Sequence, residues 1–471
     1  MGTHSEVGPV ILNGPQRKSN AISFWRRCGR LGIIGPTVLL SFTCFAAPTI
    51  LSPKTDEANP VQLLTDFQRT YLYENDYTAR AKIMTAGTMD GTSISEKTFS
   101  GGSPVKLSWK GTTGTCTVSV KRLSDEKVVY TKSVSGTSLT IYNLEIGAGY
   151  TWTVTDSAQA SASATFWTSP EPPRLIKTGD MAVMRDMGGW TGTLGGRQYK
   201  VQQNQLFRGG PATGVDEDAK DFFYTVVGVK TELDLRGSGY SGFDSASKKL
   251  EYVAMSRDTQ YKVDPKDVGT TNFKNLIKTF QYIFNADKRP LYFHCAIGRD
   301  RTGITAELTL ALLGVSLEDI WRDYETSSYK QSENIVERSS YFAAYVKRMA
   351  DYKKGYATFN EQVEAYFIED LGFTKEQIET FRTDMLIGYG EPPEPPKPTY
   401  HVEEPVYVTA TRVTFAAGES TGTQYRGFLT KKGLEYAWGK DGVPKTDWIE
   451  SDGTPMQLKK PEGDGWELMV R

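Results

Sequence analysis

Residues 290–313 read PLYFHCAIGRDRTGITAELTLALL, and they decide the fold of the largest part of this chain. The apolar stretch PLYF is typical of a buried strand, and ITAELTLALL is typical of a buried helix that follows it. A loop rich in glycine and arginine lies between them, so the order is strand, tight loop and helix N-terminus. Backbone NH groups of such a loop point inward, and together with the helix dipole they form a site for a phosphate group.

Four residues in and next to this loop have the properties that phosphoryl transfer needs. The field that attracts a phosphate also favours a thiolate, so we expect the pKa of Cys295 to lie well below the ~8.5 of a free cysteine. The planar fork of Arg301 can bind two phosphate oxygens and the charge of the transition state. Gly298 lets the backbone turn close to the anion. Thr302 can donate a hydrogen bond to the sulfur when it becomes the leaving group.

The sequence therefore predicts that Cys295 attacks phosphorus and that Arg301 is the phosphate clamp. The phosphate-binding residues expected from the loop are Ala296, Ile297, Gly298, Arg299, Asp300 and Arg301. His294 is a supporting residue, because adjacent side chains of a strand point to opposite faces and it cannot face Cys295 as a base. Only three histidines occur, at positions 4, 294 and 401, which makes a histidine-built metal site improbable. No metal or organic cofactor is expected.

Around the loop, strands alternate with helices from about residue 174, as in an α/β domain. The expected strands are VVGVKTELDL, EYVAMS and PLYFH, and residues 271–285 have the 3.6-residue period of a helix. Two later helices are separated by LGFTKEQ. In that segment Gly372 is typical of a helix C-terminus, and Thr374 with Gln377 is typical of a capping box.

These residues match the signature HCxxGxxRT of cysteine-dependent phosphatases. The surrounding sequence resembles the atypical bacterial tyrosine and phosphoinositide phosphatases, whose loop reads HCxxGKDRTG. MRDMGGW resembles their RDxGG segment, NQLFRGG their LFRS segment and VKTELDLRG their strand ending in DLR. The chain departs from the family at Arg299, where the family has Lys, and at Gly209, where it has Ser. The resemblance implies hydrolysis of phosphotyrosine on protein through a cysteinyl-phosphate, with phosphoinositides or inositol phosphates as the alternative substrates.

The reaction also requires a proton donor for the departing oxygen, and a carboxyl group is the usual source. Asp258, which follows the strand EYVAMS, and Asp300, inside the loop, are both candidates. In the resembled family both matching positions have been considered. We favour Asp258 as the acid, and we expect Asp300 to organise the loop or orient water. A further four charged residues are interpreted as structural ion pairs rather than substrate ligands, namely Arg185, Asp186, Asp234 and Arg236.

The N-terminus has the order of a secretory signal. Three arginines between residues 26 and 30 precede the apolar run LGIIGPTVLLSF and then TCFAAP, which predicts cleavage near Ala46 or Ala47. A membrane anchor is the alternative, but the run is shorter than the ~20 residues of a spanning helix, and Pro36 interrupts it. A lipid anchor on Cys44 is a further alternative. We expect an exported protein that is periplasmic, on the cell surface or secreted, without a stable membrane span in the mature chain.

With 471 residues the chain is expected to form roughly two to four units. Period-two alternation between residues 101 and 168 predicts an antiparallel β-sandwich, and LTIYNLEIGAGYTWTV resembles fibronectin type III-like modules. Before it, VQLLTDFQRTYLY predicts a helix beginning at Asn59 and Pro60. The predicted order is a signal peptide (1–47), a helical lead-in (59–98), the fibronectin type III-like β-sandwich (99–169), the α/β cysteine-phosphatase domain (174–390), a Pro-rich linker (391–398) and a β-rich tail of no assigned role (399–471).

Composition narrows the classes of function. Hydrophobic residues make up 38% and charged residues 24%, and the formal net charge is -1, so no basic footprint indicates a nucleic-acid partner. Four cysteines at positions 28, 44, 116 and 295 do not predict a disulfide framework, and Cys116 and Cys295 are interpreted as a core thiol and a reactive thiol. Other interpretations stay open. Cys295 could be a buried structural cysteine, and the protein could be a phosphate-binding relative without turnover, a secreted binding or adhesion protein, or a sulfur transferase. An aryl-phosphate assay separates an enzyme from a binding module.

Overall fold

The computed structural model describes the chain in segments. They are residues 47–73, 88–89, 92–93, 101–179, 184–212, 215–237, 250–257, 264–327, 341–390, 400–401, 412–414, 435–440, 443–450, 457–459 and 467–470. Nearly all of the predicted signal peptide lies outside these residues, as do the predicted linker 391–398 and Asp258. Within the segments that are described, no helix is both long enough and apolar enough to cross a membrane.

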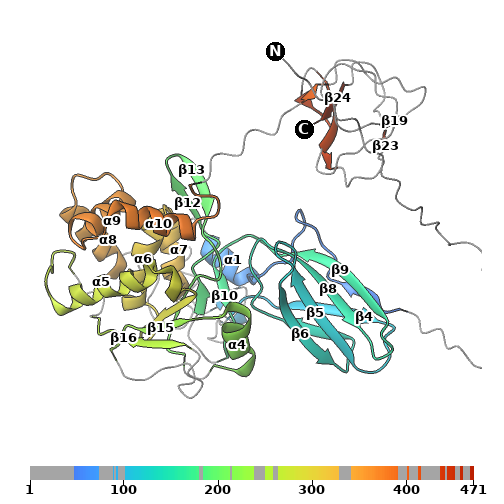
Figure 1. The fold of residues 1–471 in the computed structure, drawn as a ribbon, viewed down its shortest axis with the longest axis horizontal. Coiled ribbons are helices and arrows are strands. Elements are labelled where there is room, and N and C mark those ends of the chain that lie inside the picture. Colours follow the sequence, from blue (N-terminus) through green and yellow to red (C-terminus); the bar gives the residue numbers. More distant parts are fainter. Residues whose placement is uncertain are drawn as a thin grey trace, which may run out of the picture.

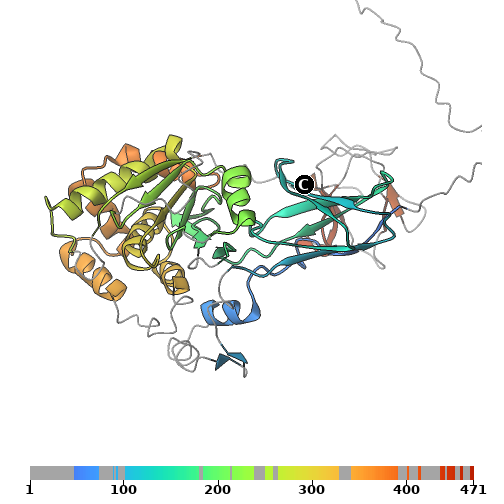
Figure 2. The ribbon, with the colours of Figure 1, turned by 90° about the horizontal axis from the view of Figure 1, so that it is seen from below.

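The larger unit is built on a mixed sheet of six strands (Figures 1 and 2). Four strands are parallel to one another, and the two at one edge pair antiparallel. In spatial order they are β10 (Arg174–Ile176), β11 (Met184–Asp186), β14 (Leu206–Gly209), β17 (Leu291–His294), β15 (Thr231–Asp234) and β16 (Glu251–Ala254). Strand β17 thus lies in the interior of the sheet, with a parallel neighbour on each side.

Helices cover both faces of this sheet. One hydrophobic core joins Leu206, Leu233 and Phe293 of the strands to the longer helices, and a second joins Phe207 and Tyr292 to the other face. The first layer contains α5 (Thr271–Phe284), α6 (Asp300–Leu312), α7 (Leu317–Thr326), α8 (Tyr341–Tyr352), α9 (Phe359–Glu369) and α10 (Lys375–Met385), and the second contains α4 (Glu217–Asp221) and the π-helix η1 (Phe222–Val227). Smaller elements are the hairpin β12 (Thr191–Leu194) and β13 (Arg197–Lys200) and the 3-10 turn η3 (Ala286–Lys288). Helix α6 is buried along nearly all of its length.

One predicted strand is wrong at its N-terminal end. VVGVKTELDL was expected to be extended throughout, but its first two valines belong to η1, Gly228 ends that helix at φ 74°, and β15 begins only at Thr231. The rings of Phe222 and Phe223 pack edge-on against Phe207, so burial of these rings outweighs the β-propensity of the valines.

Other local predictions for this unit are confirmed. The helix expected over residues 271–285 is α5. The segment LGFTKEQ separates α9 from α10, with Gly372 at φ 74°. Thr374 and Gln377 form the reciprocal bonds of a capping box at the start of α10.

The N-terminal unit, here called the β-unit, consists of two antiparallel sheets around one hydrophobic core. Val105, Leu107, Trp109 and Cys116 are all buried in this core, as the alternating sequence predicts. One sheet is β1 (Thr49–Ser52), β4 (Val105–Lys110) and β7 (Ser138–Ile141), and the other is β6 (Val128–Val134), β5 (Cys116–Arg122), β8 (Gly149–Thr155) and β9 (Ser161–Trp167). The likeness to fibronectin type III-like modules stays a prediction.

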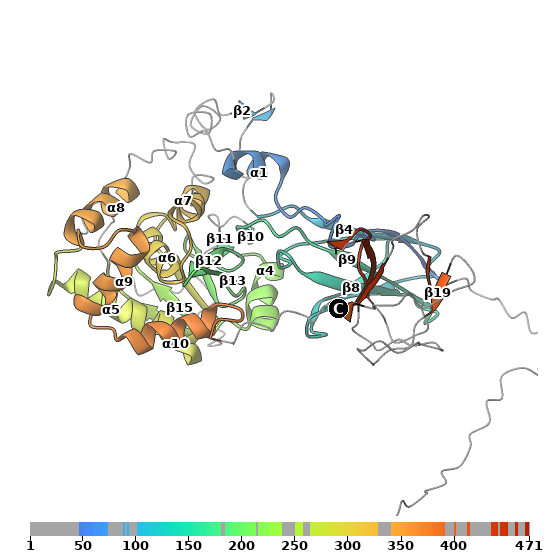
Figure 3. The ribbon, with the colours of Figure 1, turned by 90° about the horizontal axis from the view of Figure 1, so that it is seen from above.

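The first helix begins later than expected. A start at Asn59 and Pro60 was predicted, but helix α1 spans Asp66–Tyr73. Thr65 and Gln68 bond each other's backbone NH at 2.9 and 3.1 Å, which is the reciprocal pattern of a capping box. Arg322 of α7 donates to the carbonyl of Leu72 at 3.2 Å, so α1 lies against the larger unit (Figure 3).

The remaining described residues are short strands. In the predicted β-rich tail they are β18 (Tyr400–His401), β19 (Arg412–Thr414), β20 (Glu435–Lys440), β21 (Val443–Pro444), β22 (Ile449–Glu450), β23 (Gln457–Lys459) and β24 (Glu467–Val470). Strands β2 (Thr88–Met89) and β3 (Thr92–Ser93) pair with each other and lie between α1 and β4 in the sequence. No functional role follows from these strands.

The β-unit and the α/β unit are joined by buried hydrogen bonds. Arg174, with 3% of its surface exposed, donates to the carbonyls of residues 143–144 at 2.6 and 2.9 Å. Its remaining guanidinium nitrogen binds Asp186 at 2.9 Å. Gln203 and the backbone of Ile146 exchange two further hydrogen bonds, of 3.0 and 2.9 Å. The β-unit is therefore held against the α/β unit by buried polar contacts, in addition to the chain that connects them.

Candidate active site

The loop of residues 295–301, here called the phosphate loop, leaves the carboxyl end of β17 and enters α6 at Asp300. In the sheet, His294 lies opposite Gly209 of β14 and Asp234 of β15. The carboxyl ends of parallel strands meet at one edge of a sheet, and ligands bind in the crevice there. The fold therefore puts the loop where a ligand of an α/β domain is expected.

Cys295 is the first residue of the phosphate loop and is buried, with 3% of its surface exposed. Burial is the strongest influence on its pKa and acts to raise it. The hydroxyl and amide of Thr302, the amide of Ile297 and the charge of Arg301 together outweigh burial, so the pKa of this thiol is lowered. Among the described residues, the buried Thr302 hydroxyl lacks a fully formed hydrogen bond, and the sulfur is the acceptor whose charge it stabilises.

Arg301 lies at the other end of the loop, in the first turn of α6. One guanidinium nitrogen is 3.5 Å from the carbonyl of Leu235, which is the limit of a hydrogen bond. Its Nε is buried and has no hydrogen-bond partner among the described residues, and no described carboxylate forms a salt bridge with it. This guanidinium can therefore bind an anion without first breaking an ion pair.

Gly298 lies at the middle of the loop with φ 78°. A side chain here would place its Cβ 2.3 Å from the carbonyl carbon of Gly209 and 2.4 Å from the oxygen. Both the left-handed backbone and this close approach to β14 require glycine. The carbonyl oxygen of Gly298 accepts a hydrogen bond of 3.0 Å from Arg208. The loop is thus held against the end of a neighbouring strand.

Asp300 and Arg299 interact with each other. Arg299 donates from Nε at 3.0 Å to one carboxyl oxygen of Asp300 and from a terminal nitrogen at 3.4 Å to the other. Asp258, the second acid candidate, lies outside the described residues. Arg257, which precedes it, is described: its backbone NH donates to the carbonyl of Leu235 at 3.1 Å. This is the same carbonyl that Arg301 approaches.

His294 points to the other face of the sheet from Cys295, as strand geometry predicts. Its Nε2 lies 2.8 Å from Glu232 of β15, and both side chains are fully buried. Its ring stacks on Tyr292 at a centroid distance of 5.2 Å. The histidine therefore ties β17 to β15 and is not a base for the thiol.

The four residues interpreted as ion pairs have charged partners. Asp186 pairs with Arg174 at 2.9 Å, Arg185 with Asp323 at 2.7 Å, and Arg236 with Asp234 at 2.6 Å. Burial raises the pKa of Asp186 despite its arginine. Burial also acts to raise the pKa of Asp323, but Arg185 and Arg208 outweigh burial, so this pKa is lowered.

Sequence reasoning missed Asp323 and Arg208. Asp323 is 138 residues from Arg185 along the chain and lies in the helix sequence LEDIWRDYET, where its charge reads as part of a solvated face. Arg208 lies inside the segment LFRGG, which resembles the family's LFRS segment but from which no role for the arginine was predicted. The one usable signal was an arginine in an otherwise apolar strand, because a buried guanidinium needs a carboxylate partner.

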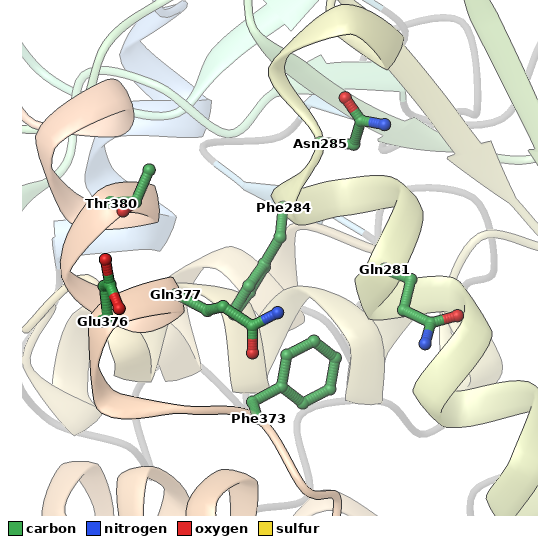
Figure 4. Close-up of a pocket in the computed structure, with 7 residues that line it drawn as sticks. All are labelled: Gln281, Phe284, Asn285, Phe373, Glu376, Gln377 and Thr380. Carbon is green, nitrogen blue, oxygen red and sulfur yellow. The ribbon is translucent and has the colours of Figure 1, made fainter.

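Two other features do not contribute to this site. Among the described residues, no group of three or more His, Cys, Asp or Glu could hold a metal ion. A pocket of about 350 Å³ lies between α5 and α10, with Phe284 and Phe373 in its lining (Figure 4). It adjoins Asn285, near the amino end of β17, whereas Cys295 follows the carboxyl end.

Comparison with known proteins finds a phosphatase family that is similar to this part of the chain. Residues 179–387 match the profile of a family described as the tyrosine phosphatase family. This part of the chain is therefore similar to the tyrosine phosphatase family. A protein of Cupriavidus necator that is named as a candidate tyrosine-protein phosphatase is 27% identical over 173 residues. That match covers 32% of this chain and 61% of the relative, so less than two thirds of the relative is represented.

A search of solved structures matches the core catalytic domain of a PP-IP phosphatase from S. cerevisiae, in complex with citrate. The identity is 16%, the match covers 32% of this chain and 93% of that chain, and the TM-score is 0.23.

Proposed function

We propose that the chain hydrolyses phosphoric monoesters, phosphotyrosine on protein first among them, with the thiolate of Cys295 as nucleophile. One observation carries the proposal: a buried thiol with a lowered pKa opens a loop at a helix N-terminus. Arg301, at the end of that loop, has no described carboxylate partner. The match of residues 179–387 to the tyrosine phosphatase family supports the same reaction.

The reaction proceeds in two displacements. In the first, the thiolate of Cys295 attacks phosphorus, the S–P bond forms, the P–O bond of the ester breaks, and the leaving oxygen takes a proton from a carboxylic acid. In the second, water attacks phosphorus, gives a proton to the same carboxylate, and displaces the thiolate. Arg301 and the loop amides stabilise the equatorial oxygens in both. Thr302 stabilises the sulfur each time it carries the negative charge.

Asp258 is the better candidate for the proton donor. Both carboxyl oxygens of Asp300 accept hydrogen bonds from Arg299. The backbone NH of Arg257 shares the Leu235 carbonyl with Arg301, and Asp258 is the next residue in the sequence, which favours Asp258 as the donor. Asp300 then orients the loop or the attacking water. We further propose that the protein is exported, on the order of charged and apolar residues at its N-terminus.

The first test is turnover of an aryl phosphate, followed by a panel of phosphotyrosine peptides and inositol phosphates. We expect turnover in the presence of a chelator, inhibition by vanadate and a preference for phosphotyrosine peptides. Preference for inositol phosphates would replace the substrate but keep the reaction. Absence of turnover with every ester would contradict the proposed function.

The second test separates the two acid candidates. Asp258→Asn and Asp300→Asn are compared on esters of graded leaving-group pKa, because an acidic leaving group needs no proton. The loss of kcat should grow with leaving-group pKa for Asp258→Asn and much less for Asp300→Asn. If the dependence occurs only in Asp300→Asn, the assignment is reversed.

A further inference from the structure

A buried cluster of three charged side chains lies behind the phosphate loop. Arg185 of β11 and Arg208 of β14 are register partners, so both side chains point to the same face of the sheet. Neither has any exposed surface, and Asp323 of α7 is 1% exposed. Both arginines bind this one carboxylate. Two buried guanidinium groups therefore share one buried acid.

The two arginines differ in what else they bind. Arg185 also uses one terminal nitrogen on α7 and the residue after it, with bonds of 2.6 Å to the carbonyl of Asp323 and 3.1 Å to Ser327. Arg208 instead extends to the phosphate loop, where it donates to the carbonyl of Gly298 at 3.0 Å. Among the hydrogen bonds described for these three residues, the one from Arg208 reaches the phosphate loop.

The bond to Gly298 fixes the direction of a loop amide. A trans peptide is planar, and its carbonyl and NH point in opposite directions. Because Arg208 holds the carbonyl of Gly298 toward the sheet, the NH of Arg299 in the same peptide unit must point away from it, toward the interior of the loop. Gly298 lies too close to Gly209 for the peptide to move toward β14.

We propose that Arg208 is a positioning residue of the active site, which acts through Gly298 to aim the phosphate loop and is itself held by Asp323. This rests on the proposed function in one respect: the oxyanion that the loop receives is the phosphoryl group of the substrate. Arg208 touches neither substrate nor the reacting sulfur. Its effect is to keep the loop amides in the geometry that stabilises a phosphate and a thiolate.

The test compares Arg208→Lys with Arg185→Lys. Both substitutions keep a positive charge next to Asp323, but a lysine ammonium at position 208 is a single point charge and cannot bridge the carboxylate and the Gly298 carbonyl as a fork does. We expect Arg208→Lys to lower kcat on an aryl phosphate about 10²-fold, the effect of a small misplacement in an active site. Arg185→Lys should lose about tenfold less than that.

Two readouts do not depend on turnover. Arg208→Lys should weaken binding of orthovanadate by about tenfold or more, and should shift the pH midpoint of Cys295 alkylation upward, since misaimed amides stabilise both anions less. Arg289→Lys is the matched control, because Arg289 is 3% exposed and pairs with Asp384, beside the amino end of β17. It should change neither readout, whatever it does to the thermal midpoint.

Equal effects of Arg208→Lys and Arg185→Lys on vanadate binding and alkylation would overturn the proposal, because the cluster would then act only through the stability of the fold. If wild type binds vanadate but hydrolyses no ester, the proposed function fails, while these two readouts still decide the role of Arg208. Arg208→Gln replaces the lysine variant if the latter does not fold. An unchanged vanadate affinity in that variant would also overturn the proposal.

Discussion

The described part of the chain contains two buried thiols whose surroundings have opposite polarity. Cys116 opens β5 in the core of the β-unit, and Cys295 opens the phosphate loop, with 0% and 3% of their surfaces exposed. The sulfur of Cys116 lies 3.8 Å from the carbonyl of Gly114, an acceptor that suits a protonated thiol. Around Cys295 the polar groups are donors and an arginine, which suit a thiolate. Hydrogen-bond donors, rather than exposure, are therefore what distinguishes the two thiols.

The largest expected effect tests whether Cys295, and not Cys116, is the nucleophile of the proposed reaction. Cys295→Ser should lower turnover of an aryl phosphate by about 10⁴-fold or more, because a serine hydroxyl is scarcely ionised near neutral pH. Cys116→Ala should leave kcat within about twofold of wild type, since Cys116 lies outside the active site. Steady-state kinetics of both variants measures this, and substantial turnover by Cys295→Ser would remove the mechanism.

The next prediction concerns a substitution that removes the planar guanidinium fork of Arg301 but keeps its positive charge beside Cys295. Arg301→Lys should lower kcat by about 10²- to 10³-fold, as a point charge cannot bind two equatorial oxygens of the transition state. The fall should be mainly in kcat, because the fork binds the transition state more strongly than the ester. A change confined to KM would mean that Arg301 binds the ester and the transition state equally.

A smaller effect concerns the donors around the sulfur. The pKa of Cys295 is lowered, so its thiolate persists as the pH falls below the ~8.5 of a free cysteine, and alkylation slows only when the pH falls through the lowered value. Thr302→Val removes one donor with little change of shape and should move the midpoint of alkylation up by about one pH unit. Mass spectrometry of the alkylated peptides keeps Cys295 separate from Cys116. A midpoint that does not move would show that the hydroxyl contributes nothing to the thiolate.

The smallest effect is on stability. Cys116→Ala removes a buried sulfur from the core of the β-unit and should lower the free energy of unfolding by about 1–2 kcal/mol. Denaturant unfolding measures this change. A loss of this size with unaltered kcat would complete the contrast between the two thiols, whereas no loss would mean that the sulfur fills no needed space.

Local signals predicted a good part of this molecule. The chemistry of the phosphate loop, the strand before it and the helix after it are contiguous in sequence, and the capping box at Thr374 lies within four residues. The start of α1 and the helical residues of η1 were missed, because distant partners decide them: Val61 bridges Thr168, and Phe222 and Phe223 pack on Phe207. Tertiary contacts of this kind override local propensity.

The candidate site likewise contains some residues that the local sequence predicts and others that it does not. Cys295, Arg301 and Gly298 could be named from one motif, because the loop closes on itself. Asp323 could not, since it is brought to Arg208 only when α7 packs on the sheet, 115 residues further along the chain. The role of a buried charge depends on its partner, and the sequence does not reveal which of many acids is that partner.

Strand β11 has a consequence for how this protein can be inherited. Its Arg185 faces the cluster behind the phosphate loop, and its Asp186, one residue on, faces Arg174 and through it the carbonyls of residues 143–144. A recombination event that exchanged the β-unit for an unrelated module would leave two guanidinium nitrogens of the buried Arg174 without their carbonyl partners. Selection would then act against the destabilised protein. The two units are thus expected to be inherited together, because residues of the six-stranded sheet make the contacts that join them.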